Sequence, residues 1–159
     1  MRRIVIFIIV ILNLFIYTNQ SSQEDYLKIV TNVTPKRVKQ GEEGILKIKI
    51  TPKEHIRISS HPEFIIKLDQ SNSLTFSKVF FTASELDFQT KQEQENVYLE
   101  LKKEVEIPFK LNETSLIGKH TISGEIIFTA VFKDNWSLKT YQKFVAGFNA
   151  SRNSRTRKR

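Results

Sequence analysis

The stretch Gly124-Glu-Ile-Ile-Phe-Thr-Ala-Val-Phe-Lys-Asp-Asn-Trp-Ser137 decides the fold, because it combines a buried strand with a polar loop. Ile126, Phe128 and Ala130 recur at every second position, which is the period of a β-strand with one face in a core. The polar segment that follows surrounds the only tryptophan of the chain. We expect this strand to cover His120–Phe132.

Segments with a similar alternation occur along the chain, and polar residues, Pro or Gly separate them. No segment has the sustained 3.6-residue period of a helix. Thr82–Asn96, which is rich in charge, is predicted to be a long loop with at most one helical turn. Pro108 indicates an edge or a bulge. The expected strands are Tyr26–Val33, Ile45–Ile50, His55–Ser60, Phe64–Leu68, Leu74–Phe81, Val97–Leu111, His120–Phe132 and Lys139–Phe148, with turns at Pro35–Glu43 and Asp69–Ser73.

Seven or eight short strands over about 120 residues predict an all-β fold, an immunoglobulin-like antiparallel β-sandwich. The chain has 159 residues, of which 40% are hydrophobic, and this is enough to bury one core. The predicted core consists of the apolar residues on one face of the expected strands: Leu46, Ile48, Ile50, Phe64, Ile66, Leu68, Val105, Ile107, Ile122, Ile126, Phe128 and Ala130.

The N-terminus has the pattern of a secretory signal peptide. Arg2 and Arg3 precede the apolar segment Ile4–Tyr17, and a polar segment follows it. As a helix this apolar segment would rise about 21 Å, short of the roughly 30 Å of a bilayer core. We therefore expect a signal peptide over residues 1–22, a folded domain over 26–149 and a periplasmic or secreted location. An uncleaved membrane anchor is the alternative, since no clean small-x-small cleavage site is visible.

The net charge of +8 comes from the two ends of the chain. Arg2, Arg3 and five basic residues among the last eight account for seven of the 25 Lys and Arg. The remaining 18 basic residues nearly balance the 17 Asp and Glu. A basic nucleic-acid-binding face is therefore not expected. Residues 150–159 are predicted to be a disordered basic tail that can contact an anionic surface through Arg152, Arg155, Arg157, Lys158 and Arg159.

The chain contains no cysteine, which excludes thiol catalysis, disulfides and Cys-type metal sites. No Gly-x-Ser-x-Gly elbow or phosphate-binding glycine loop is present. The three histidines, His55, His61 and His120, have no metal-binding spacing and are interpreted as structural or solvent-exposed. We therefore predict no catalytic residue, no metal and no cofactor.

Several motifs in order carry a family resemblance that extends from about residue 28 to 148. They are Val33-Thr-Pro35, Val38-Lys-Gln-Gly-Glu42, Leu46-Lys-Ile-Lys-Ile50, Pro62-Glu-Phe-Ile-Ile-Lys-Leu68, Glu104-Val-Glu-Ile-Pro-Phe-Lys-Leu111 and Gly118-Lys-His-Thr-Ile-Ser-Gly-Glu-Ile-Ile-Phe-Thr-Ala130. Their order and spacing resemble the N-terminal periplasmic domain of the thiol:disulfide interchange protein DsbD.

The resemblance implies an immunoglobulin-type sandwich in which a capping loop covers a redox cysteine pair. Val131 and Ser137 occupy the positions that match this pair, and neither can form a thiolate. Thr82–Asn96 corresponds to the capping loop. The resemblance thus implies the scaffold without the thiol chemistry. The function that it still implies for this chain is a partner-docking surface around Val131 and Ser137.

The expected function is that of an exported, non-enzymatic binding module that acts through residues 82–96 and 132–138 at one end of the sandwich. Phe88, Asn135 and Trp136 are the candidate contacts for a protein partner in the cell envelope. Two alternatives stay open. The first is an accessory of a periplasmic thiol–disulfide pathway that positions a thioredoxin-like partner. The second is an envelope adhesin or structural module held by its basic tail.

Overall fold

The computed structural model describes residues 25–134 and 136–153, and in this part of the chain every regular element is a β-strand. The predicted signal peptide lies outside the described residues. Among the described residues no helix has the length and hydropathy of a membrane span. The strands are β1 Leu27–Thr34, β2 Arg37–Lys39, β3 Glu43–Pro52, β4 Arg57–Ile58, β5 Ile65–Leu68, β6 Leu74–Phe76, β7 Phe80–Thr82, β8 Gln89–Glu93, β9 Asn96–Glu100, β10 Val105–Leu111, β11 Gly118–Val131 and β12 Ser137–Ser151.

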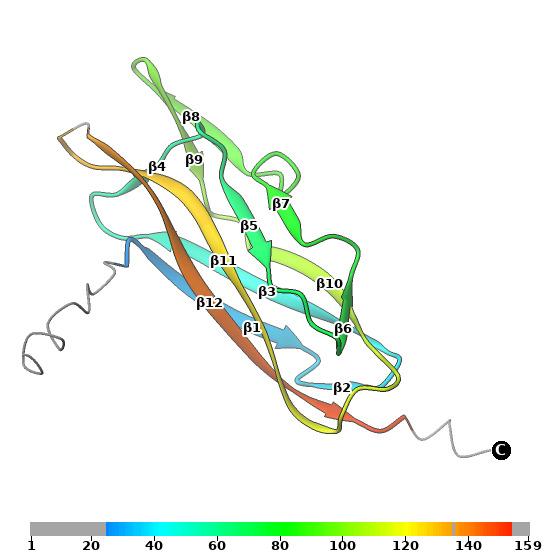
Figure 1. The fold of residues 1–159 in the computed structure, drawn as a ribbon. Coiled ribbons are helices and arrows are strands. Elements are labelled where there is room, and N and C mark those ends of the chain that lie inside the picture. The colour runs from blue at the N-terminus through cyan, green and yellow to red at the C-terminus, as the bar shows by residue number, and fades with distance from the viewer. Residues whose placement is uncertain (1–24, 135, 154–159) are drawn as a thin grey trace, which may run out of the picture.

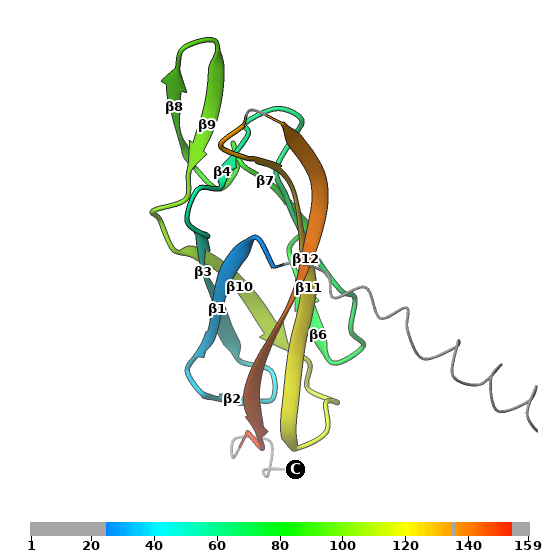
Figure 2. The ribbon, with the colours of Figure 1, turned by 90° about the vertical axis from the view of Figure 1, so that its left-hand side faces the viewer.

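The strands form two sheets that pack face to face (Figure 1). One sheet has the order β1-β3-β10-β6, and the other has the order β2-β12-β11-β5-β7, with β4 paired to β11. All neighbours are antiparallel except β2 and β12. The prediction of an immunoglobulin-like antiparallel β-sandwich is confirmed. A third, two-stranded sheet of β8 and β9 projects from one end of the sandwich (Figure 2).

The core between the sheets contains all twelve residues that the alternation predicted, and each of them is buried. The alternation is clearest in β10, where Val105, Ile107, Phe109 and Leu111 are buried and the residues between them are exposed. Pro108 interrupts nothing, because β6 pairs with β10 only from Phe109 onward. The sequence predicted an edge or a bulge at Pro108; this residue lies opposite Ile45 of β3, and only its side toward β6 is unpaired.

Two predicted strands are each divided in the structure. Leu74–Phe81 was expected as one strand, but β6 pairs with β10 in one sheet and β7 pairs with β5 in the other. The chain changes sheets at Ser77–Val79, so that Phe76 packs against Phe109 and Phe81 is buried under the second sheet. Val97–Leu111 is likewise interrupted by a turn between β9 and β10. Alternation alone does not reveal such a change of layer, because both halves keep the same period.

Two further segments, one near each end of the folded chain, also differ from the expectation. The predicted turn Pro35–Glu43 contains β2, whose Val38 is buried and whose backbone pairs with the end of β12. Ala150 and Ser151, the first two residues of the predicted tail, belong to β12 and lie opposite Val38 and Lys39. Strand pairing therefore orders the chain up to this point.

Close approach of backbone and side chains makes Gly124 the residue of β11 that tolerates least change. A Cβ atom at Gly124 would lie 2.4 Å from the Lys67 carbonyl oxygen and 2.8 Å from the Phe144 ring, whereas one at Gly147 would meet no atom closer than 4.0 Å. We expect Gly124→Ala to lower the free energy of unfolding by about 1–3 kcal/mol through overpacking. Urea denaturation followed by circular dichroism measures it. Gly147→Ala is the matched control and should change stability by less than about 1 kcal/mol; equal losses for both variants would contradict the argument.

Candidate functional site

Val131 and Ser137 lie directly opposite each other at the end of the β11–β12 hairpin. The Phe132 N–H donates to the Trp136 carbonyl oxygen at 3.0 Å, so the next pair outward is a hydrogen-bonded one. Because the two kinds of pair alternate in an antiparallel ladder, Val131 and Ser137 form a non-hydrogen-bonded pair, with Cα atoms about 4.5 Å apart. The two positions singled out by the family resemblance are thus cross-strand neighbours.

The short strand β4 connects this hairpin to the projecting sheet. Arg57 lies opposite Val131 in the β4–β11 pairing. Two residues later, Ser59 forms a β-bridge with Tyr98, and the Ser60 N–H donates to the Val97 carbonyl oxygen at 3.0 Å. β4 and the residues after it therefore join β9 and the β11–β12 hairpin at one end of the sandwich.

The prediction of a long loop over Thr82–Asn96 is wrong for its second half, which forms β8 and pairs with β9 along five residues. The sequence of β8, Gln89-Thr-Lys-Gln-Glu93, has no apolar residue, and nearly all of it is exposed. Hydrophobic alternation therefore gives no signal, and the strand forms through its backbone partner. The first half is a compact turn, in which Glu85 accepts hydrogen bonds from the Thr82 N–H and hydroxyl and pairs with Lys78. Lys78 and Thr82 lower the pKa of Glu85 to about 2.

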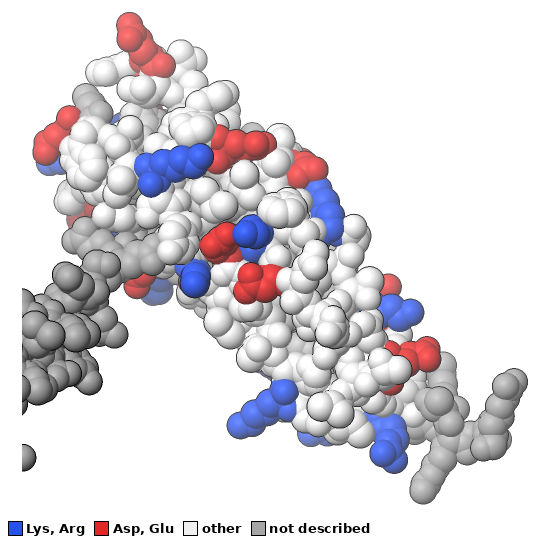
Figure 3. Space-filling model, in the orientation of Figure 1, with Lys and Arg blue, Asp and Glu red and all other residues white. Residues whose placement is uncertain are grey.

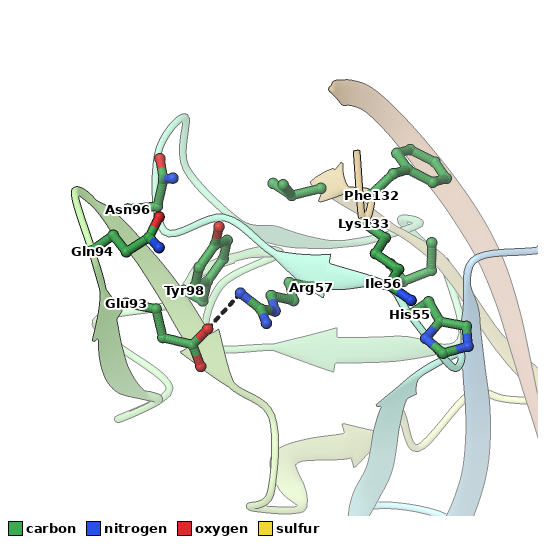
Figure 4. A pocket seen from close by; sticks show the side chains of 10 residues that line it. His55, Ile56, Arg57, Glu93, Gln94, Asn96, Tyr98, Phe132 and Lys133 are labelled. Carbon is green, nitrogen blue, oxygen red and sulfur yellow. Dashed lines mark ion pairs between the residues drawn. The ribbon is translucent and has the colours of Figure 1, made fainter. Parts of the chain in front are cut away.

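A cavity of about 490 Å³ lies between β4, the β8–β9 hairpin and the end of the β11–β12 hairpin. Figure 4 shows Arg57 at its centre, between Tyr98 and Glu93 on one side and Lys133 on the other. Its wall combines charged groups with an apolar part made by Ile56, Val131, Phe132 and the Tyr98 ring. The lining residues are His55, Ile56, Arg57, Glu93, Gln94, Asn96, Tyr98, Val131, Phe132 and Lys133.

Arg57 makes two contacts that orient its guanidinium in the cavity. It forms an ion pair with Glu93, and it lies over the Tyr98 ring at 5.1 Å from the centroid. Glu93 also accepts from Lys91 at 2.9 Å, and this hydrogen bond, followed by the charge of Arg57, lowers the pKa of Glu93. The cavity thus offers a guanidinium and the Lys133 ammonium, with one carboxylate that is already shared. This arrangement can bind an anionic or hydrogen-bonding group beside an apolar one.

Trp136 is 51% exposed and stacks on Phe132, with ring centroids 3.9 Å apart. Phe132 in turn contacts Tyr26 edge-on at 5.4 Å. One face of the indole therefore rests on the sandwich end while the remainder of the ring is open to solvent. Asn135, the other predicted contact of this turn, lies outside the described residues.

Phe88 does not occupy the predicted surface position. It is only 8% exposed and packs edge-on against Phe64, with centroids 5.5 Å apart. The prediction that Phe88 is a partner contact is therefore corrected, because its ring fixes the turn before β8 to the core. The candidate functional side chains that sequence reasoning missed are Arg57, Glu93 and Tyr98. They belong to three different strands, β4, β8 and β9, and no sequence motif connects them.

The remaining predicted residues lie elsewhere. Arg152 is exposed at the end of β12, far along the hairpin from the cavity, and Arg155, Arg157, Lys158 and Arg159 lie outside the described residues. The three histidines are separated: His61 contacts Ser60, His55 lies near Glu54, and His120 stacks on Phe148. No group of three potential metal-ligating His, Asp or Glu residues is found within the described residues.

No protein-family model matches this sequence, and no curated protein matches it significantly. Among solved structures, a protein of unknown function from Porphyromonas gingivalis W83 has 7% identity and a TM-score of 0.48, with coverage of 82% of this chain and 50% of that one. A variant of BcpA, the major pilin subunit of Bacillus cereus, has 10% identity and a TM-score of 0.44, covering 80% and 40%. A cohesin module from a Clostridium perfringens family 33 glycoside hydrolase has 12% identity and a TM-score of 0.41, covering 79% and 100%. The chain thus spans half or less of the first two structures, and these likenesses concern the fold alone.

The pairing of Val131 with Ser137 can be tested by introducing two thiols. The Cα separation of about 4.5 Å in such a pair lies within the roughly 4.4–6.8 Å that disulfides span. We expect Val131→Cys/Ser137→Cys to form an intramolecular disulfide on mild oxidation, detected by thiol titration and mass spectrometry. Val131→Cys/Thr140→Cys is the control, because Thr140 lies opposite Phe128 instead. A disulfide in both variants, or in neither, would contradict the register.

Proposed function

We propose that this protein is an exported, non-catalytic binding module that holds a protein partner at the hairpin end of its sandwich. The observation that carries the proposal is the shared cavity, in which Val131, Arg57 and Tyr98 come together from three strands. In the family that the sequence resembles, a loop covers the cysteine pair. The counterpart of this loop in our proposal is β8 with the turn before it. A cavity wall with an oriented guanidinium, next to a half-exposed tryptophan, has the residue types that dominate protein interfaces.

A protein partner suits the site better than a small molecule does. The cavity is lined largely by polar groups, and the Trp136 ring extends the contact surface beyond it. Small-molecule sites are mostly apolar and enclose their ligand. A loop or strand of a partner could place an acidic side chain against Arg57 and an apolar one against Trp136. Such a mixed contact fits the composition of this end of the domain.

A second candidate function is that of an accessory in a thiol–disulfide pathway of the cell envelope. The cross-strand pairing of Val131 and Ser137 supports it, since the family resemblance assigns the redox pair to these positions. Because the chain has no cysteine, it would position a thioredoxin-like partner without exchanging electrons itself. The two candidates share the docking surface and differ in the chemistry of the partner.

The experiment that tests the proposal captures partners in the cells that produce the protein. A photoreactive amino acid at Lys133 should crosslink any protein bound at the cavity, and the same group at Lys143, on the exposed side of β12, is the matched control. In a second arm, the thiolate of Val131→Cys should attack the disulfide of an oxidised thioredoxin-like partner, which releases one partner thiol and leaves a reducible mixed disulfide. Adducts from both arms to one thioredoxin-like protein would favour the accessory function, whereas crosslinks without thiol adducts would favour the general binding module.

The purified partner then allows a quantitative test with the natural, cysteine-free chain. Trp136→Ala and Arg57→Ala should each weaken its binding at least tenfold, as expected for central aromatic and Arg contacts. Phe80→Ala is the control, because Phe80 is a similarly exposed aromatic residue on β7. Titration calorimetry gives the dissociation constants. If all three variants bind equally well, the hairpin end is not the docking site.

A further inference from the structure

The loop between β10 and β11, at the opposite end of the sandwich from the cavity, exposes two large aliphatic side chains side by side. Leu116 is 81% exposed, more than any other large hydrophobic residue of the described part, and Ile117 is 54% exposed. Single exposed apolar residues are common on protein surfaces, but adjacent ones at the tip of a loop are a recurrent feature of contact sites.

The loop is held in place, so these side chains are exposed by the local structure and not by a lack of contacts. Ser115 is buried, and its hydroxyl donates to the Ser73 carbonyl oxygen at 2.8 Å. The Gln40 side-chain amide donates to the Ser115 carbonyl oxygen at 2.6 Å, and His120 Nε2 contacts the Leu116 carbonyl oxygen at 2.7 Å. These bonds fix the backbone on both sides of the tip, and the aliphatic groups point away from the core that could have buried them.

Basic residues surround the loop. Lys119 and Arg37 both lie opposite Asn149 in neighbouring strands, and the Asn149 N–H donates to the Lys36 carbonyl oxygen at 2.9 Å. Arg152 follows directly after β12. These four side chains form ion pairs with no acidic residue of the described chain.

Acidic residues are fewer at this end. Glu42 pairs with Lys39 at 3.5 Å, Glu43 lies opposite Lys110, and Glu113 lies beside Gly41. Basic side chains gather at the lower end of the visible face in Figure 3. The sequence leaves the described structure here and continues with Arg155-Thr-Arg-Lys-Arg159, which adds four positive charges.

We propose that this end of the domain docks on a phospholipid bilayer that carries anionic headgroups. Leu116 and Ile117 enter the interfacial layer, and Lys36, Arg37, Lys119 and Arg152 stay at the headgroups. Apolar side chains at a membrane surface and basic residues near anionic lipids both favour binding, so the two features act in the same direction here. A soluble polyanion would use the cations but gain nothing from two exposed aliphatic groups, so the lipid surface is the occupant that both features fit.

Attachment through the Leu116 loop would also determine how far the cavity lies from the bilayer. β11 runs for fourteen residues from Gly118 to Val131, which corresponds to about 43 Å at the usual rise of a strand. A domain attached by the Leu116 loop would therefore hold its cavity and Trp136 well away from the lipid headgroups.

Tryptophan quenching by brominated lipids tests this arrangement. The wild-type chain has one tryptophan, Trp136, at the distal end. Its fluorescence should be unaffected by vesicles containing bromine on the acyl chains and an anionic lipid such as phosphatidylglycerol. In a Leu116→Trp/Trp136→Phe variant, the new indole should be quenched and its emission shifted to shorter wavelength. Quenching of Trp136 in the wild type, or no quenching of the tryptophan at 116, would overturn the proposal.

Vesicle sedimentation measures the affinity independently. Leu116→Ser/Ile117→Ser should lower partitioning onto anionic vesicles at least tenfold. Val30→Ser/Val145→Ser removes two valines of comparable exposure, 51% and 60%, on the side of the sandwich and should leave partitioning unchanged. Circular dichroism verifies that each variant is folded. Equal partitioning of the two double variants would refute the insertion of the loop. Salt-sensitive binding to a soluble polyanion such as heparin that equals vesicle binding would refute the lipid as its partner.

Discussion

The pairing of β11 with β12 over fourteen residue pairs is the constraint on which the rest of the structure depends. Side chains alternate between faces along β12, so a shift of this strand by one residue would turn Phe144, Ala146 and Phe148 from the core toward solvent. The close approach of Gly124 to Lys67 and Phe144 leaves no room for a different register at the middle of the hairpin. Because both strands are long and continuous, this one register also fixes what lies at each end.

At one end, the register brings Val131 opposite Ser137 and lets β4 join the β8–β9 hairpin to the sandwich. At the other end, it brings Lys119 next to Asn149 and so places β2, the Leu116 loop and the exit of the chain together. The middle of the domain contributes much of the buried apolar surface, and the two ends carry the cavity with Trp136 and the Leu116 loop. This separation allows the ends to be changed with little cost to the core.

The sequence was sufficient to predict the fold class and twelve residues of the core, because burial of one face per strand produces a period of two in strands such as β3 and β10. It was insufficient where structure does not depend on apolar side chains. β8 is polar throughout and forms only because β9, with its buried Tyr98 and Leu99, offers a backbone edge. Phe88 shows the converse problem. An aromatic residue in a charged segment was a candidate partner contact, but its ring packs on Phe64 and attaches that segment to the core. The cavity was out of reach for the same reason, since Arg57, Glu93 and Tyr98 meet only through strand pairings that leave no pattern in the sequence.

The contacts at the cavity are of unequal strength, and this difference bears on how a partner could enter. The base of the β8–β9 hairpin is held by buried groups, namely Phe88, Leu99 and Leu101. Near its tip, the ion pair of Glu93 with Arg57 joins the hairpin to β4, and both side chains are partly exposed. Exposed ion pairs contribute little to stability, because water and salt compensate for each charge when the pair separates. A carboxylate from a partner can therefore replace Glu93 beside Arg57 without loss of the buried contacts. The same exchange would leave the stacked pair of Phe132 and Trp136 intact, so the charged and the aromatic parts of the site can be occupied together.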